Sequence, residues 1–157
     1  MINFNSNITI YLQEPRWSGA EINMVRKVLK ACKLKSYGVS LKLSNDKEIQ
    51  FLNYKWMGKN RPTNVLSFPN KVSSNKMCLK RTYLGDIIMS YQTLKKESKI
   101  GKISFLNHMS HLLIHGILHL KGYTHENRLN EKVMQKEEVK ILKILRICNP
   151  YKNDRLQ

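Results

Sequence analysis

The chain has 157 residues, 41% of them hydrophobic, which suits one domain with a buried core. Its 28 lysine and arginine residues and 11 acidic residues give a net charge of +17, and such a surface attracts polyanions such as nucleic acids. The alternative explanation is AT-rich coding, which enriches lysine whatever the function. No run approaches the roughly eighteen apolar residues of a membrane span, and the N-terminus lacks a signal-peptide layout, so we expect a cytoplasmic protein with no membrane partner.

The predicted elements alternate between strands and helices along the first half of the chain. Alternating or short apolar runs predict strands over residues 8–12, 37–44, 65–68 and 84–91. Apolar residues at helical spacing predict helices over residues 19–34, 46–56, 92–99, 103–121 and 129–147. The first helix is capped by Ser18, and the second by Asn45 or Asp46. The polar residues 70–82 predict a mobile loop, and Glu137 and Glu138 lie amid lysines and indicate a solvated helix face.

The order of elements, βαβαββααα, indicates an α/β (α+β) fold class. Helices between the early strands favour parallel pairing of those strands. The loop between the third and fourth strands allows an antiparallel pair. We therefore expect a single domain over residues 1–157, with a mixed four-stranded sheet and helices packed on it.

All five histidines lie between residues 108 and 125. His115 and His119 are four residues apart, on one side of the predicted helix, and Gly122 lets the chain turn so that His125 approaches them. This spacing, H-x-x-x-H-x-x-G-x-x-H, is that of the three-histidine zinc site of metzincin proteases. Three imidazoles leave a fourth coordination position for water, as in catalytic sites. The pattern predicts one zinc ion on these three residues, against the alternative of a polar stripe on a helix.

The general base of the proteases is missing from this segment. Metzincins place a glutamate directly after the first histidine, where this chain has Gly116. A metal without that base still acts as a Lewis acid on a phosphoryl oxygen, and the positive charge favours a phosphodiester substrate. We expect His111 to stand next to the ligands and His108 to be exposed. Asp86 on the fourth strand either approaches the metal, as a candidate catalytic group, or binds backbone amides.

Residues 115–125 resemble the H-G-x-L-H-L-x-G-Y-D-H signature of the YbeY family. Residues 62–69 resemble its P-T-[DN]-V-L-S-F-P segment, and residues 84–88 its L-G-D-[IL]-x strand. The resemblance runs in register from about residue 38 to residue 126. It implies a zinc-dependent, single-strand-specific endoribonuclease with the metal on the three histidines. It further implies maturation of the 3′ end of small-subunit (16S) ribosomal RNA, and ribosome quality control.

Two positions depart from the family pattern. Met57 replaces an arginine regarded as functionally important in the family, so Lys55, Lys59 or Arg61 would have to supply the cation and contact RNA. Thr124 replaces the aspartate before the third ligand and offers only a hydroxyl next to the metal site. The missing arginine leaves a second hypothesis open, a zinc-stabilised ribosome assembly factor with weakened catalysis. A metallopeptidase is the third hypothesis, supported only by the ligand spacing.

Overall fold

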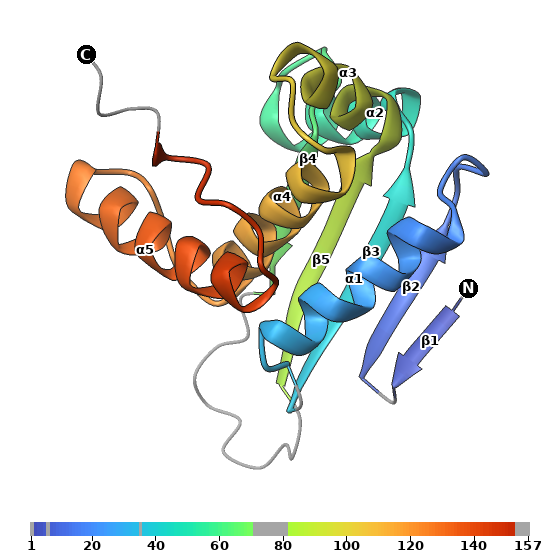
Figure 1. The fold of residues 1–157 in the computed structure, drawn as a ribbon. Coiled ribbons are helices and arrows are strands. Elements are labelled where there is room, and N and C mark those ends of the chain that lie inside the picture. The colour runs from blue at the N-terminus through green and yellow to red at the C-terminus, as the bar shows by residue number, and fades with distance from the viewer. Residues whose placement is uncertain (1, 6, 35, 71–81, 153–157) are drawn as a thin grey trace.

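A computed structural model describes residues 2–5, 7–34, 36–70 and 82–152 of the chain. The elements, in chain order, are β1 (Ile2–Asn5), β2 (Ile8–Leu12), α1 (Gly19–Ala31), β3 (Tyr37–Ser44), α2 (Asp46–Met57), β4 (Val65–Pro69), β5 (Thr82–Ser90), α3 (Tyr91–Ile100), α4 (Phe105–Leu120) and α5 (Arg128–Ile144) (Figure 1). The predicted mobile loop over 70–82 falls largely outside the described residues. Among the described residues, no helix is long and apolar enough to cross a membrane.

The strands form one mixed sheet in the order β1-β2-β3-β5-β4. β2 pairs with β3, and β3 with β5, in parallel, whereas β4 and β5 are antiparallel, as expected from the connections. The mixed sheet with packed helices is confirmed, and the predicted order of elements holds from Ile8 onward. The sheet has five strands instead of four, because β1 adds an antiparallel strand at one edge. Four residues alternate too briefly to distinguish such a strand from a polar terminus.

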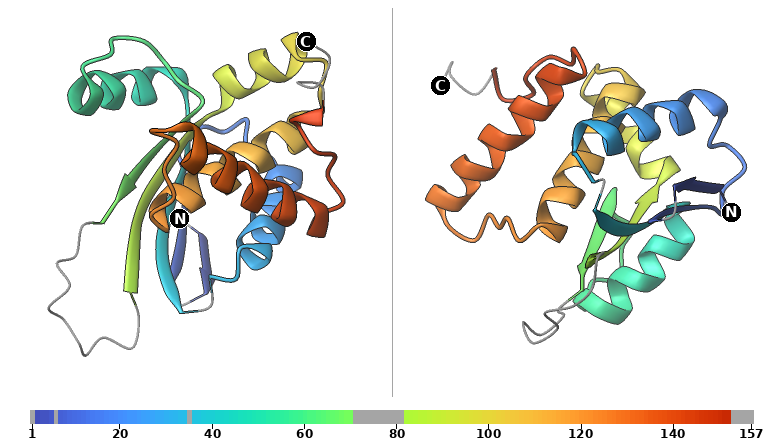
Figure 2. Two further views of the ribbon diagram at one scale, coloured as in Figure 1. Left: turned by 90° about the vertical axis from the view of Figure 1, so that its left-hand side faces the viewer. Right: turned by 90° about the horizontal axis from the view of Figure 1, so that it is seen from below.

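Helices cover both faces of the sheet (Figure 2). α1 and α4 pack on one face, α5 packs on α4, and α2 packs on the opposite face. The larger core cluster, between α1, α4 and the sheet, includes Ile10, Leu41, Met89, Leu113 and Ile117. The smaller cluster, under α2, contains Ile49, Leu66 and Ile88. Because side chains alternate along a strand, successive residues of β5 face α4 and α2 in turn.

The connection from α2 to β4 is held by hydrogen bonds from α2 itself. α2 ends at Gly58, which has a left-handed φ of 68°. The buried Asn53 donates from Nδ2 to the carbonyl oxygen of Arg61 at 2.8 Å, and the amide of Lys59 donates to the carbonyl oxygen of Asn53 at 3.3 Å. These contacts fix the backbone that carries Lys59 and Arg61, two of the predicted RNA-binding residues.

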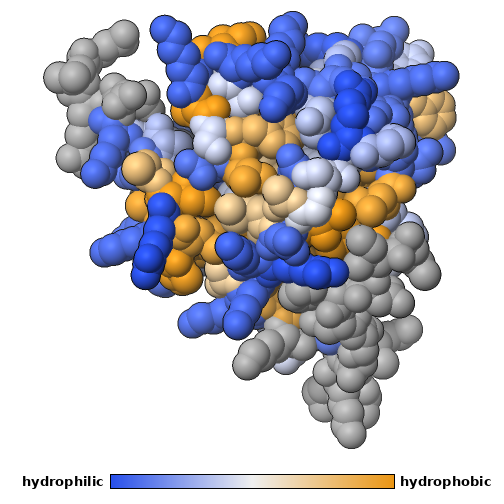
Figure 3. Space-filling model, turned by 45° about the vertical axis from the view of Figure 1, so that its right-hand side comes forward, coloured by the Kyte–Doolittle hydropathy of each residue, from blue (hydrophilic) through white to orange (hydrophobic). Residues whose placement is uncertain are grey.

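On the face drawn in Figure 3, hydrophilic side chains lie mainly towards the rim, and hydrophobic ones extend across the middle. The hydrophilic rim is in keeping with a chain of which 25% of the residues are charged. Several large apolar side chains are nevertheless exposed, and two of them, Trp56 and Met57, stand at the end of α2.

Candidate metal centre

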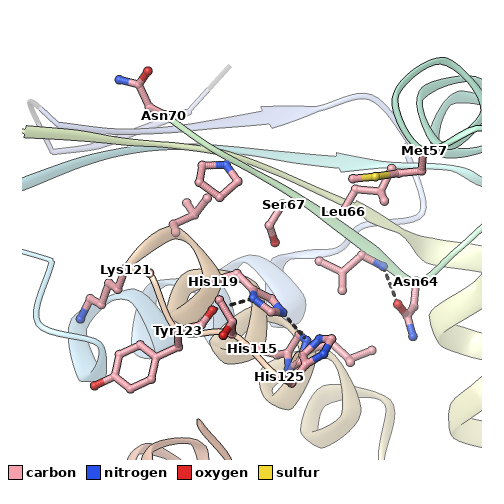
Figure 4. Close-up of a pocket in the computed structure, with 16 residues that line it drawn as sticks. Met57, Asn64, Leu66, Ser67, Asn70, His115, His119, Lys121, Tyr123 and His125 are labelled. Carbon is pink, nitrogen blue, oxygen red and sulfur yellow. Dashed lines mark hydrogen bonds between the residues drawn. The ribbon is translucent and has the colours of Figure 1, made fainter. Parts of the chain in front are cut away.

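The last turns of α4 and the segment that follows bring three histidines together (Figure 4). His115 and His119 project from one side of α4. The chain then leaves the helix at Gly122, whose φ of 91° is left-handed, and His125 returns towards the other two rings. One nitrogen of each ring lies within 4.8 Å of the others. The three histidines are therefore positioned to bind a metal ion.

Hydrogen bonds set the orientation of two of these rings. Nδ1 of His115 lies 2.7 Å from Oε1 of Glu138, and Nδ1 of His119 donates to the carbonyl oxygen of Tyr123 at 2.9 Å. The two Nε2 atoms then face each other 2.9 Å apart. Burial, together with the neighbouring His115, lowers the pKa of His119, which favours a neutral ring. Neutral imidazoles held in this way fit a zinc ion.

A cavity of about 840 Å³ opens beside the histidines, between α4, β4 and the end of α2. Besides the three histidines, its walls are formed by residues from these elements and from the turn after α4: Met57, Asn64, Val65, Leu66, Ser67, Pro69, Asn70, Leu112, Leu120, Lys121, Gly122, Tyr123 and Thr124. Asn64, Asn70 and Lys121 were not predicted as site residues, although Asn64 and Lys121 lie within the family segments over 62–69 and 115–125. The three histidines therefore stand at the wall of an open cavity.

Gly116 faces the sheet, not the cavity centre. A Cβ on this residue would lie 3.0 Å from Oγ of Ser67 and 3.4 Å from Cδ1 of Ile87. α4 therefore packs closely on β4 and β5 at this point, and a side chain here would press on Ser67 and Ile87. The general base expected of a metzincin peptidase is missing from the sequence, and a glycine at its position allows this close packing.

The other histidines of α4 lie away from the ligand nitrogens. His111 places Nε2 3.2 Å from Oε2 of Glu138, the same carboxylate that contacts His115, so it stands behind the ligands. His108 was expected to be exposed, and this prediction is wrong. Its side chain is only 15% exposed, and its Nε2 lies 2.7 Å from Oε2 of Glu97, because α3 packs against α4.

Thr124 lines the cavity, and its hydroxyl accepts a hydrogen bond from Nδ2 of Asn130 at 3.2 Å. Asp86 is not brought to the site. It lies on the face of β5 that carries Ile88, away from α4, and its carboxylate accepts a hydrogen bond from the hydroxyl of Tyr83 at 2.7 Å. Side-chain alternation along β5 explains this, since Ile87 is the residue that faces α4.

The predicted cations around Met57 are exposed and do not line the cavity, whereas Met57 itself does. Nζ of Lys55 lies 5.4 Å from the ring centroid of Trp56, and Lys59 and Arg61 follow on the α2–β4 connection. Among the described residues that line the cavity, Lys121 is the one lysine or arginine, and its Nζ donates to the carbonyl oxygen of Cys32 at 2.7 Å. The cavity wall at the position of the family arginine is therefore apolar.

Comparison with known proteins agrees with this geometry. The family model for Endoribonuclease YbeY matches residues 3–146. A protein named Endoribonuclease YbeY from Ehrlichia chaffeensis is 47% identical over 114 residues, which cover 72% of this chain and 70% of that protein. A protein of the same name from Rhizobium etli is 42% identical over 120 residues, which cover 76% of this chain and 69% of that protein. The solution structure of a Thermotoga maritima protein superposes with a TM-score of 0.58 at 26% identity, covering 88% of this chain and 91% of that one. The chain belongs to the YbeY family, and this membership supports an endoribonuclease role.

Proposed function

We propose that this protein is a zinc-dependent, single-strand-specific endoribonuclease of the cytoplasm. Its substrate would be the 3′ end of small-subunit (16S) ribosomal RNA, in late maturation and in ribosome quality control. The observation that carries the proposal is the convergence of His115, His119 and His125 at the wall of an open cavity, in a chain of this family with a net charge of +17. A zinc ion bound there would supply Lewis acidity towards a phosphoryl oxygen.

The chain's own residues would hold the ligands and the RNA. Two histidine rings are oriented through Nδ1, which leaves Nε2 directed at the common centre. His111 and Thr124 lie around the three histidines, and we assign both residues the role of supporting these ligands. Lys55, Lys59 and Arg61 lie within four residues of Met57, which lines the cavity, and we assign them to contacts with RNA phosphates.

The apolar wall at Met57 favours a second candidate function, a zinc-stabilised ribosome assembly factor with weakened catalysis. Phosphodiester cleavage builds up negative charge, which positively charged donors stabilise. The ammonium group of Lys121 is held by Cys32. On this hypothesis the protein binds the small ribosomal subunit through its positive surface, and the metal mainly ties the segment after α4 to the helix.

Cleavage of single-stranded ribosomal RNA fragments by the zinc-loaded protein tests the proposal. We expect cleavage that stops both on addition of a chelator and in His115→Ala. Fragments that include the 3′ end of the small-subunit RNA should be cut in preference to the same sequence in a duplex. Cleavage that persists in His115→Ala and in chelator would contradict a metal-dependent nuclease. An intact, zinc-binding protein that binds these fragments without cutting them would favour the assembly factor. Mass spectrometry of the native protein identifies the metal.

A further inference from the structure

Glu138, on α5, is a buried carboxylate behind the metal centre. Its side chain is 1% exposed, whereas the neighbouring Glu137 is 31% exposed and lies 3.4 Å from Nζ of Lys140. The prediction of a solvated face thus fails for Glu138, because α5 turns this residue towards α4. A buried carboxylate is unfavourable unless hydrogen-bond donors compensate for the lost water.

Three donors surround this carboxylate. Oε1 lies 2.7 Å from Nδ1 of His115, and Oε2 lies 3.2 Å from Nε2 of His111. The hydroxyl of Tyr151 donates to Oε2 and also lies 3.0 Å from Nε2 of His111. The rings of His111 and Tyr151 meet edge to face, with centroids 5.5 Å apart. The carboxylate therefore joins α4, α5 and the segment after α5 at one point.

The contact with His115 decides which nitrogen of that ring is available to a metal. Oε1 of Glu138 lies 2.7 Å from Nδ1 of His115, and a carboxylate oxygen accepts a hydrogen bond from a ring nitrogen that carries a proton. This contact therefore favours the tautomer of His115 that is protonated at Nδ1. Nε2 of His115 is then the unprotonated nitrogen, and it is the atom that faces His119.

We propose that Glu138 is a positioning residue of the metal centre, which holds His115 with Nε2 directed at the metal, and that Tyr151 and His111 hold Glu138 in turn. This inference rests on the metal site of the proposed function. It assigns a role to the segment after α5, because Tyr151 connects that segment to a metal ligand. Partners that orient a ligand histidine typically contribute 10–100-fold to metal affinity.

Zinc affinity, measured on the full chain by competition with a chromophoric chelator, tests the inference without RNA. Glu138→Gln keeps the shape of the side chain, and we expect it to weaken zinc binding about 10-fold or more. Tyr151→Phe removes one hydroxyl, and we expect it to weaken binding by a smaller factor. Glu137→Gln is the matched control, since it makes the same change at the adjacent, more exposed residue, and it should bind zinc like the wild type.

A second readout reports on the ring itself. In metal-free protein, proton–nitrogen correlation spectra should show His115 protonated at Nδ1 in the wild type and a mixture of tautomers in Glu138→Gln. Equal zinc affinity of the folded Glu138→Gln and Glu137→Gln variants would overturn the inference while leaving the proposed function standing. A wild-type protein that binds no zinc would overturn the metal site itself, and with it both proposals.

Discussion

Gly85 on β5 lies so close to Phe68 on β4 that a Cβ on Gly85 would be 2.1 Å from the carbonyl oxygen of Phe68. Gly85 also has a φ of 138°, a conformation that residues with a side chain rarely adopt. Because of this close approach, the backbones of β4 and β5 lie against each other at the end of β4, the strand that forms one wall of the cavity. It explains why a glycine stands between Leu84 and Asp86.

We expect Gly85→Ala to destabilise the fold by roughly 3 kcal/mol or more, because strained backbone and overpacking act together. Urea unfolding followed by circular dichroism measures the change. Gly19→Ala is the control, since nothing lies within 4 Å of a Cβ at Gly19, and it should change the stability by less than about 1 kcal/mol. Equal stability of the two variants would contradict the packing described here.

Met57→Arg should increase RNA cleavage. Met57 lines the same cavity as the histidines, so an arginine here would bring a guanidinium towards them, and one donor positioned at developing negative charge is worth about 100–1000-fold in kcat. Initial rates on one single-stranded RNA at fixed zinc measure the effect. Met57→Lys adds a positive charge without the planar guanidinium group, so its cleavage rate should increase less. If neither variant is faster than the wild type, another cation already acts at this site.

Removal of the metal should lower the thermal midpoint of the protein. A ligand that binds only the folded state at 100 times its Kd stabilises by about 2.7 kcal/mol. For a chain of this size that corresponds to a decrease of roughly 5–10 °C on adding chelator. His125→Ala should lose this sensitivity to chelator, whereas His108→Gln, outside the donor set, should keep it. A chelator effect of equal size in wild type and His125→Ala would argue against the three-histidine site.

Cys32 and Cys148 should differ in reactivity. Burial raises the pKa of the Cys32 thiol to about 12, opposed by the nearby Lys121, whereas Cys148 is exposed. At pH 8, iodoacetamide should modify Cys148 and leave Cys32 unmodified in the folded protein, as peptide mapping can show. Between pH 9 and pH 12 the thiol of the unfolded chain ionises and the buried one does not, so this group lowers stability as the pH rises. Labelling of Cys32 at the same rate as Cys148 at pH 8 would contradict its burial.

The convergence of the three histidines could be predicted from the sequence because their arrangement is local. Helical periodicity places His115 and His119 on one side of α4, and Gly122 accounts for the return of His125. Glu138 could not be predicted in the same way. Its role depends on how α5 approaches α4, and a glutamate amid lysines resembles any exposed helix residue.

Asp86 illustrates a second reason why part of the site could not be predicted from the sequence. β5 is covered by helices on both faces, so Ile87, Ile88 and Met89 are all buried. A continuous apolar run gives no indication of which residues face which side. The sequence therefore predicted the strand but not that Asp86 turns away from the histidines. The sequence likewise did not predict that Lys59 and Arg61 lie outside the lining of the cavity, because their position depends on the path of the α2–β4 connection.

The three histidines and the carboxylate of Glu138 emerge from the ribosome at different times during synthesis. His115, His119 and His125 lie within one short stretch of chain, whereas Glu138 and Tyr151 are added later, during translation from the N-terminus. A nascent chain that has emerged as far as residue 125 already exposes all three histidines of the site. On the function proposed above, metal binding would begin during synthesis, and the docking of α5 would then make the bound ion harder to lose.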